Sequence, residues 1–249
     1  NEDQFDDFEQ AIPLLSEEEE RALTESAVPE SLPILPLKNT VLFPGVVVPI
    51  TVGRDRSLAL VKEAYAGDRI IGVVTQKDMD VEEPTYDDLH TVGTVAQILK
   101  LIKMPDGSRS VVIQGKSIFK VKEFTQDQPY FRANTEASPK EMDIQGIELS
   151  ASIRNVKETA VDIINKSPNI PTEAAVAVNN INSPVFLLNF IASNLNVDIE
   201  DKQDLLETVT FSENLEKIME FLEEELQLLN MSEKIRTKVK SDIDDQQRE

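Results

Sequence analysis

The side chains that most often carry out catalysis or bind metals are scarce in this sequence. The chain has 249 residues, no cysteine and a single histidine, His90. The absence of cysteine excludes thiolate nucleophiles, disulfides and cysteine-bound zinc. One histidine cannot form a histidine metal cluster. Because His90 follows an acidic stretch, we interpret it as a surface residue and not as a member of a Ser–His–Asp triad.

Two patterns imitate functional motifs. The tripeptide Gly115-Lys116-Ser117 looks like the end of a P-loop, but Ser110 stands where that motif needs its first glycine. The tripeptide also lies within an expected strand, so no helix N-terminus follows it to bind phosphate. Carboxylates in the segment 77–90 lack the spacing of a calcium loop, and we interpret the segment as a solvated loop. The sequence therefore predicts no catalytic residue, no cofactor site and no metal site in this chain, and indicates a binding or adaptor module.

The net charge of the chain is −21, and it is unevenly distributed. Residues 1–30 contain eleven acidic residues and one basic residue. High charge with low hydrophobicity opposes collapse, so we expect a disordered acidic tail. The alternative is a short docking helix in which Ser16 and Glu19 form a capping box. Phosphate contacts need clustered Lys and Arg, so a chain this acidic is not expected to bind nucleic acid.

No stretch of the sequence has the length and apolarity of a membrane span. Its apolar runs fall well short of the roughly 20 residues needed to cross a bilayer. The acidic N-terminal segment is also unlike a signal or transit peptide. We therefore expect a soluble, cytoplasmic protein.

Residues 31–138 show mostly the pattern of β-strands, with one early helix. The clearest element is a hairpin whose arms, 91–104 and 108–124, alternate apolar and polar residues around a Pro-Asp-Gly turn. A helix is expected over 55–67, with Asp55 as its N-cap. Further strands are expected at 32–37, 46–52, 69–76 and 130–137. Many strands with one helix favour a small, partly closed β-barrel over a parallel α/β sheet.

The most apolar stretch is VLFPGVVVPI, at residues 41–50, and it contains two prolines and a glycine. Proline removes a donor from a strand ladder, so this stretch is not expected in the middle of a sheet. We interpret it as a short apolar segment that ends at Gly45, followed by an edge strand that Pro49 terminates. The prolines also prevent other chains from pairing with that edge.

Beyond residue 139 the apolar residues recur at helical spacing. A compact helical lobe is expected over 139–210, in which Pro168 ends the first long helix. Ser183 is expected to cap a later helix that has Pro184 at its first position.

A long helix is expected over 211–249, with Ser212 as its N-cap. No proline or glycine interrupts this segment, and its distal part carries a thin apolar stripe on a charged surface. The stripe consists of Met231, Ile235, Val239 and Ile243. Such a helix either frays in solvent or continues as a rigid connector toward a missing part or a partner.

At residues 32–61 the sequence resembles the start of the Lon protease N-terminal domain. The shared residues are Pro36, Leu37, Lys38, Asn39, Phe43, Pro44, Gly45, Pro49, Val52, Gly53 and Arg54. Further similar segments follow in order: VVTQKD at 73–78, residues 87–107, VVIQGKSIFKV at 111–121, EDKQDLLET at 200–208 and DDQQRE at 244–249. The resemblance covers nearly everything after residue 31.

The resemblance implies an α+β fold with a PUA-like β-barrel lobe, then an α-helical bundle lobe and a long C-terminal helix. With the pattern along the chain, this gives a β lobe at 31–138, a helical lobe at 139–210 and a connector helix at 211–249; the acidic tail at 1–30 is expected from its composition, and the resemblance does not cover it. The resemblance also implies a parent ATP-dependent serine protease, usually a hexamer, with an AAA+ module and a Ser–Lys dyad. Those active parts, and the ATP and magnesium that they use, are expected beyond Glu249, so no catalytic or cofactor residue is assigned here.

The resemblance leads to three functional hypotheses. The first is the substrate-recognition region of a Lon-type protease, which binds misfolded, damaged or degron-bearing proteins and helps the ring of Lon subunits assemble. The second is a free-standing adaptor domain without a protease. The third is an RNA-binding PUA-type module, which the negative charge disfavours.

A protein that binds unfolded polypeptides is expected to expose apolar surface of its own. The candidate contacts form three groups, in the apolar stretch, at the hairpin tip and on the long helix. They are Phe43, Pro44, Val46 and Val47, then Met104 and Pro105, and then Met219 and Met231. The alternatives are burial in the lobe's own core for the first group and an inert turn for the second.

Overall fold

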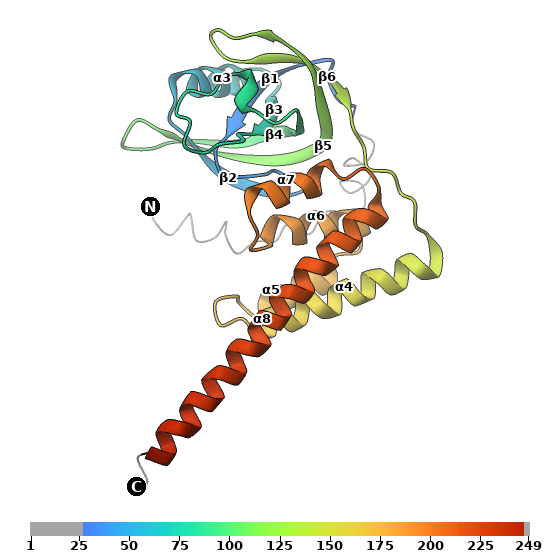
Figure 1. The fold of residues 1–249 in the computed structure, drawn as a ribbon. Coiled ribbons are helices and arrows are strands. Elements are labelled where there is room, and N and C mark those ends of the chain that lie inside the picture. Colours follow the sequence, from blue (N-terminus) through green and yellow to red (C-terminus); the bar gives the residue numbers. More distant parts are fainter. Residues whose placement is uncertain (1–26, 247–249) are drawn as a thin grey trace.

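The computed structural model describes residues 27–246, and side chains as far as residue 239. The acidic tail expected at 1–30 therefore lies outside the described residues, apart from its last four, and so does the expected capping box of Ser16 and Glu19. Figure 1 shows strands gathered in one part of the molecule and helices in another, with the last helix extending away from both.

The β part of the chain is a mixed sheet of six strands in the order β2-β5-β4-β3-β1-β6. β1 and β3 are parallel, and the other neighbours are antiparallel. β6 pairs with β1 and also with β5, so the pairing leads from β5 through the sheet and back to β5. The strands are β1 (Ser31–Leu37), β2 (Val47–Val52), β3 (Ile70–Thr75), β4 (Val92–Lys103), β5 (Arg109–Gln126) and β6 (Arg132–Ala137).

The expected strands are all present. β4 and β5 form the long hairpin, joined by a turn at residues 104–108 in which Gly107 adopts a φ of 89°. In the part of the chain that the structure describes, β2 pairs only with β5, so Pro49 lies in an edge strand, as expected. Gly115 donates its backbone N–H to the carbonyl oxygen of Val46, so Pro49 falls among the alternate residues that face away from β5. The missing N–H of Pro49 therefore removes no bond from the sheet.

Helix α3 (Asp55–Ala66) follows β2 and packs on the sheet, as Figure 1 shows. The prediction that Asp55 caps this helix is wrong, because Arg54 is the N-cap and Asp55 is already helical. The side chain of Arg54 makes no capping hydrogen bond to the first turn. At the other end Gly67 donates its N–H to the carbonyls of Glu63 and Ala64 and ends the helix.

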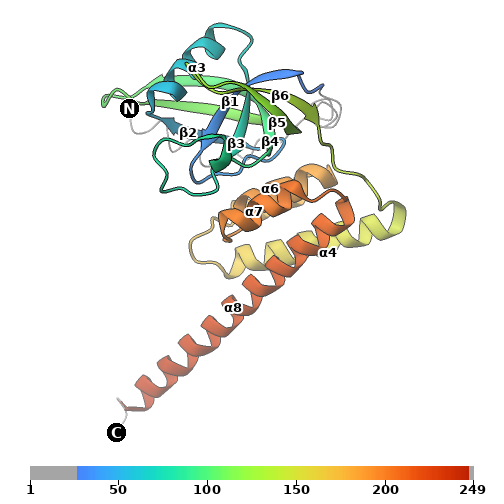
Figure 2. The same cartoon turned by 45° about the horizontal axis from the view of Figure 1, so that its top comes forward.

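The helical part follows the last strand and packs below the sheet, as Figure 2 shows. The prediction for Ser183 is confirmed, because its hydroxyl accepts a hydrogen bond of 3.1 Å from the N–H of Phe186. The first long helix ends at Lys166, two residues before Pro168. The helices are α4 (Gly146–Lys166), α5 (Glu173–Asn180), α6 (Pro184–Asn194), α7 (Ile199–Glu207) and α8 (Phe211–Gln246), and a short 3-10 helix, η1 (Tyr86–Asp88), lies in the β part.

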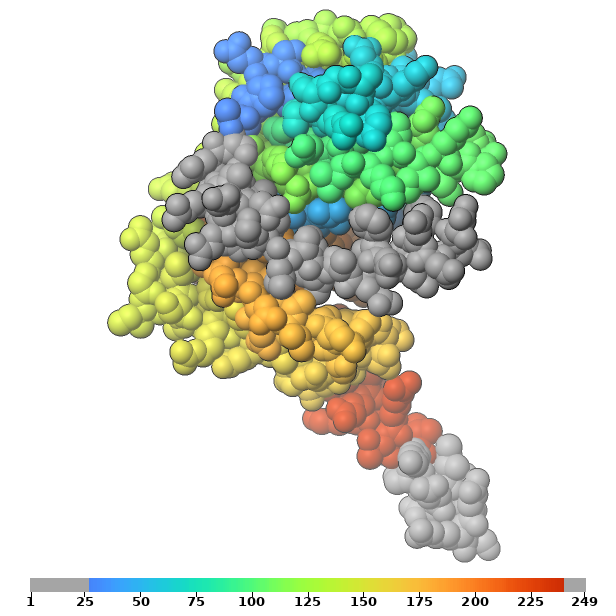
Figure 3. All heavy atoms as spheres, turned by 180° about the vertical axis from the view of Figure 1, so that it is seen from behind, coloured from blue at the N-terminus to red at the C-terminus, as the bar shows by residue number. Residues whose placement is uncertain are grey.

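α8 is a single helix of 36 residues, and its distal half extends beyond the other elements. The space-filling view from behind shows this half projecting alone from the body of the protein (Figure 3). Ser212 is not the N-cap that the sequence suggested, because the helix begins at Phe211. The carboxylate of Asp143 instead accepts hydrogen bonds from the backbone N–H and the hydroxyl of Ser212, which lowers the pKa of Asp143. Within the described residues no helix is long and apolar enough to cross a membrane.

Three apolar clusters form the core, and the largest joins the β part to the helices. Two clusters lie within the β part, around Ile113 and Phe119 respectively. The third combines buried residues of α4, α5, α6, α7 and α8 with four residues of the β part. Those four are Val41, Phe43, Val46 and Ile118. The apolar stretch at 41–50 therefore contributes to a core that spans both parts.

Gly115 permits the close approach of the 43–45 backbone to β5. A Cβ atom at this position would lie 2.3 Å from the carbonyl oxygen of Phe43, which is backbone and cannot rotate away. We expect Gly115→Ala to lower the free energy of unfolding by about 1–3 kcal/mol, the usual cost of overpacking. The measurement is urea unfolding followed by circular dichroism.

Gly53→Ala is the matched control, because a Cβ at Gly53 meets nothing within 4 Å. Its effect is expected to stay within about 0.5 kcal/mol. Equal effects of the two substitutions would show that the contact with Phe43 does not restrict residue 115.

Candidate functional site

The first predicted group of contact residues lies between the β part and the helices. Phe43 and Val46 have 1% and 7% of their surface exposed and pack in the cluster that includes α4 to α8. Pro44 is buried as well, while Val47 is half-buried on β2. Phe43, Pro44 and Val46 are therefore buried, as the alternative for them expected, but they lie between two parts of the fold and not in the core of the β part alone. Contact of these residues with a substrate stays a prediction.

Hydrogen bonds fix the same segment on both sides. The carbonyl oxygen of Pro44 accepts a bond of 3.1 Å from the side-chain amide of Asn189 on α6, which is 3% exposed. On the sheet side, Gly45 donates its N–H to the carbonyl of Gly115 at 3.0 Å. The hydroxyl of Thr94 donates to the carbonyl of Leu42 at 2.6 Å. The segment is thus bound to β4, β5 and α6 at once.

A second set of polar contacts joins α7 to the β part. The side-chain amide of Gln203 donates to the carbonyl of Val92 at 3.0 Å. His90 lies 3.7 Å from the carboxylate of Glu207, and only 21% of its side chain is exposed. His90 is therefore a half-buried residue at the surface, beside α7, and is less exposed than the interpretation of it as a surface residue suggested. Burial lowers the pKa of His90, and the charge of Glu207 opposes this shift.

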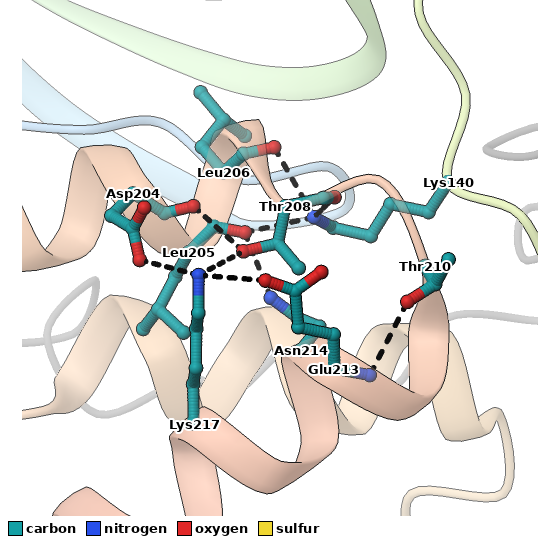
Figure 4. Close-up of polar contacts among 9 residues, drawn as sticks. All are labelled: Lys140, Asp204, Leu205, Leu206, Thr208, Thr210, Glu213, Asn214 and Lys217. Atoms are coloured by element: carbon teal, nitrogen blue, oxygen red, sulfur yellow. Dashed lines mark hydrogen bonds and ion pairs between the residues drawn. The ribbon is translucent and has the colours of Figure 1, made fainter.

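Lys140, in the link between β6 and α4, binds the C-terminal end of α7 (Figure 4). Its ammonium group donates to the carbonyl oxygens of Leu205, Leu206 and Thr208 at 2.8, 3.2 and 2.5 Å. Carbonyl groups at the end of a helix lack partners within the helix, and a lysine there satisfies them. Burial, together with the nearby charge of Lys217, lowers the pKa of Lys140 to about 8.

Lys217 on α8 approaches the same helix end from the opposite side (Figure 4). Its ammonium group contacts the carboxylates of Asp204 at 2.7 Å and Glu213 at 3.1 Å. It also donates to the hydroxyl of Thr208 at 3.3 Å. These contacts raise the pKa of Lys217, the hydrogen bond with Asp204 most of all. Two lysines from different segments thus hold the turn between α7 and α8.

The second predicted group lies at the tip of the β4–β5 hairpin. Pro105 is exposed and Met104 is half-buried. The turn is internally ordered, because Asp106 accepts bonds from the N–H and the hydroxyl of Ser108 at 2.9 and 2.6 Å. These bonds lower the pKa of Asp106. The tip therefore presents an apolar proline on a defined turn.

The third predicted group divides along α8. Met219 is half-buried against the core, whereas Met231 is 64% exposed. Met231 belongs to a row of exposed apolar side chains on the projecting half of the helix. The row is Leu228, Met231, Ile235 and Val239, each between 51% and 64% exposed. The three predicted groups are thus on separate elements and do not form one site.

The sequence did not indicate the roles of Lys140, Asn189 and Gln203, whose side chains bind backbone carbonyls far away in the sequence. Asn189 contacts a carbonyl 145 positions away, and Gln203 contacts one 111 positions away. Gln203 lies in the segment 200–208 that resembles the Lon family, but neither that segment nor the sequence around the other two residues indicates the contact that each side chain makes. Within the described residues no group of three or more His, Asp or Glu could hold a metal ion. Gly115-Lys116-Ser117 lies inside β5.

Comparison with known proteins gives a consistent result. The sequence model of the ATP-dependent protease La (LON) substrate-binding domain matches residues 31–224. A Lon protease of Flavobacterium johnsoniae is 46% identical over 247 residues, which cover 99% of this chain and 30% of that protein. A Lon protease of Parabacteroides distasonis is 34% identical, over 98% of this chain and 31% of that protein. The chain therefore spans about 30% of the length of these relatives.

Two solved structures share the fold. The N-terminal domain of Mycobacterium avium complex Lon protease matches 78% of this chain and 98% of its own, with a TM-score of 0.65 and 20% identity. A Lon N-terminal domain protein from Xanthomonas campestris matches 76% of this chain and 96% of its own, with a TM-score of 0.55 and 18% identity.

Proposed function

The chain belongs to the Lon substrate-binding domain family, and we propose that it binds misfolded, damaged or degron-bearing proteins for an ATP-dependent Lon protease. The observation that carries the proposal is the match of residues 31–224 to the substrate-binding domain of that family. In this proposal ATP hydrolysis and Ser–Lys peptide cleavage belong to a part of the protein outside this chain. The chain's own role is to bind polypeptides.

We place the polypeptide contacts on the exposed members of the predicted set. Pro105 at the hairpin tip and Met231 on α8 are exposed. Unfolded proteins differ from folded ones by their accessible apolar segments, which pair with apolar surface on the binding protein. Methionine adapts to varied partners because its side chain is flexible and polarisable. Phe43 and Val46 are buried where the two parts of the fold join, so we do not place the main contacts there.

The wider organisation follows from the same assignment. We infer an acidic tail at 1–30, a PUA-like β lobe at 31–138, a helical lobe at 139–210 and a connector helix at 211–249. The ring of pairings from β5 through β4, β3, β1 and β6 supports the barrel character of the β lobe. The projecting half of α8 supports its role as a connector. We further propose a cytoplasmic protein whose Lon subunits assemble as a hexamer.

Substitutions at the two exposed groups test the proposal. We expect Met104→Ser combined with Pro105→Ser, and Met231→Ser combined with Ile235→Ser, each to weaken binding of a permanently unfolded model protein. Burial of an apolar side chain contributes about 1.5–3 kcal/mol. Losing part of this free energy on substitution weakens binding roughly fivefold. Fluorescence anisotropy of the labelled unfolded protein measures the affinity.

Val176→Ser on α5 is the matched control, because Val176 is 61% exposed and outside both groups. It is expected to leave the affinity unchanged. If the unmodified chain did not bind the unfolded protein at all, the proposed function would be rejected. If it bound and both pairs of substitutions had no effect, the contact surface would lie elsewhere.

A further inference from the structure

A cleft of about 560 Å³ lies between β1 and β2, away from the junction with the helices. One wall comes from β1 and the residues after it, and the other from β2 and the start of α3. Leu35, Ile50 and Val52 give the cleft an apolar floor, and each is at most 9% exposed. A volume of this size accommodates a small ligand or a few residues of a peptide.

The β2 wall presents a backbone edge that no strand of the described residues 27–246 occupies. β2 pairs with β5 on one side only. Pro49 and Thr51 line the cleft and belong to the alternate residues that face away from β5. The free groups are therefore the carbonyls of both residues and the N–H of Thr51. An extended peptide can pair with these three groups as a short additional strand. The missing N–H of Pro49 removes one donor and keeps the ladder short, so the expectation that the prolines prevent all pairing at this edge is replaced here by pairing over two residues.

The end of this edge leads to the N-terminus of α3, a helix of 12 residues whose N-cap, Arg54, makes no side-chain capping bond. Ser57, in that first turn, lines the cleft and is only 8% exposed. Among the described residues its hydroxyl has no hydrogen-bond partner. Because Ser57 is nearly buried yet lines the cleft, its hydroxyl opens into the cleft next to the N–H groups of the first helical turn, and together they offer donors to a hydrogen-bond acceptor bound there.

Two cations flank this position. The side-chain carbonyl oxygen of Gln76, Oε1, accepts a hydrogen bond of 2.6 Å from the guanidinium of Arg54. Gln76 is itself fixed, because its amide donates to the carbonyls of Asp78 and Val81. Lys38 also lines the cleft and forms an exposed ion pair of 2.9 Å with Glu82. Asp55, exposed in the same helix turn, and Glu82 are the neighbouring negative charges.

We propose that this cleft binds the carboxylate end of an extended polypeptide. The chain end lies along β2, parallel to it, and forms backbone bonds with Pro49 and Thr51. The terminal carboxylate accepts hydrogen bonds from the N–H groups of the first turn of α3 and from Ser57, and it faces Arg54. An apolar side chain of the peptide rests on the floor formed by Leu35 and Ile50.

The balance of charge favours a peptide carboxylate over a free phosphate. Glu82 and Asp55 oppose a dianion more strongly than a single negative charge, and a free phosphate uses neither the apolar floor nor the strand edge. The proposal rests on the proposed function, because it names the part of an unfolded or cleaved protein that one site of this domain recognises.

The test uses the 249-residue chain and a fluorescent eight-residue apolar peptide made as the free acid and as the C-terminal amide. We expect the amide to bind at least about tenfold more weakly, as loss of hydrogen bonds to a charged group predicts. Ser57→Ala should weaken binding of the acid severalfold and leave the amide unchanged. A third peptide, an amide that ends in glutamate, distinguishes a side-chain carboxylate from the chain end and is expected to bind like the plain amide.

Glu82→Gln gives a test in which binding increases. Removing this carboxylate frees Lys38 for the ligand, so affinity for the acid should rise about threefold while that for the amide stays constant. Glu83→Gln removes the same charge from a neighbouring residue outside the cleft lining and should produce no such rise. A rise for both peptides alike would contradict the proposal.

The two proposals fail in distinguishable ways. Anisotropy with a permanently unfolded protein is measured on the same samples. Equal affinity for acid and amide overturns the carboxylate site, and if the unfolded protein still binds, the proposed function stands. Equal or stronger binding of the glutamate-ended amide also overturns recognition of the chain end. If neither peptide nor unfolded protein binds, both proposals are overturned.

Discussion

Phe43→Ala will lower the free energy of unfolding of the chain by about 3–5 kcal/mol, the usual cost of removing a fully buried phenylalanine. Phe43 is 1% exposed and packs in the cluster that joins the β part to the helices. Its backbone neighbours are bound to β4, β5 and α6, so the loop cannot collapse freely into the space left by the ring. Urea unfolding followed by circular dichroism measures the change.

The substitution also tests the predicted contact of Phe43 with substrate. At temperatures where the variant is folded, we expect its affinity for an unfolded model protein to stay within about twofold of the unmodified chain. Phe221→Ala is the control, since Phe221 packs against the same cluster but is only half-buried, and it should cost less stability. A folded Phe43→Ala variant that no longer bound the unfolded protein would show that Phe43 reaches the substrate.

Lys140→Met will destabilise the chain by about 1–3 kcal/mol at pH 7, because it leaves carbonyl groups at the end of α7 without their donor. The loss should grow as the pH rises from 8 toward 10. The pKa of Lys140 is about 8 in the folded state, below the ordinary value of 10.5. Between these values the unfolded state binds more protons, so the stability of the unmodified chain increases with pH. The variant lacks this increase.

The size of the pH effect is bounded by the pKa difference. Each unit corresponds to about 1.4 kcal/mol, so the gap between the unmodified chain and the variant can widen by up to about 3 kcal/mol. Lys217→Met is the comparison variant. The pKa of Lys217 is raised, so its own contribution is constant up to pH 10 and is lost only as the pH rises above the ordinary value of 10.5. Removing its charge also moves the pKa of Lys140 back toward the ordinary value, so the rise in stability between pH 8 and 10 should be smaller in this variant than in the unmodified chain. Urea unfolding at pH 7, 8, 9 and 10 measures both variants. A constant gap for Lys140→Met would contradict a lowered pKa.

The sequence by itself determined the elements of this fold and its family. Strand alternation and turn chemistry located β4 and β5 as a hairpin, and the interruption by Pro49 correctly indicated an edge strand. These signals are local, since they depend on residues a few positions apart. The segment at 32–61 indicated the Lon family for the same reason, because a short ordered series of residue types is readable without coordinates. The helix ends were predicted less accurately. Asp55 and Ser212 were both predicted as N-caps, but each lies inside its helix.

The tertiary structure alone decided which side chains are surface and which are core. The sequence around an apolar residue such as Phe43 does not show whether its side chain faces a substrate or another part of its own fold. Its burial depends on α6 and on the other helices, more than 100 positions later in the chain. The donors that hold the carbonyls of α7 and the cleft beside Ser57 likewise depend on distant segments meeting. Such contacts leave no periodic pattern, because they are set by how the elements pack and not by the spacing of neighbouring residues.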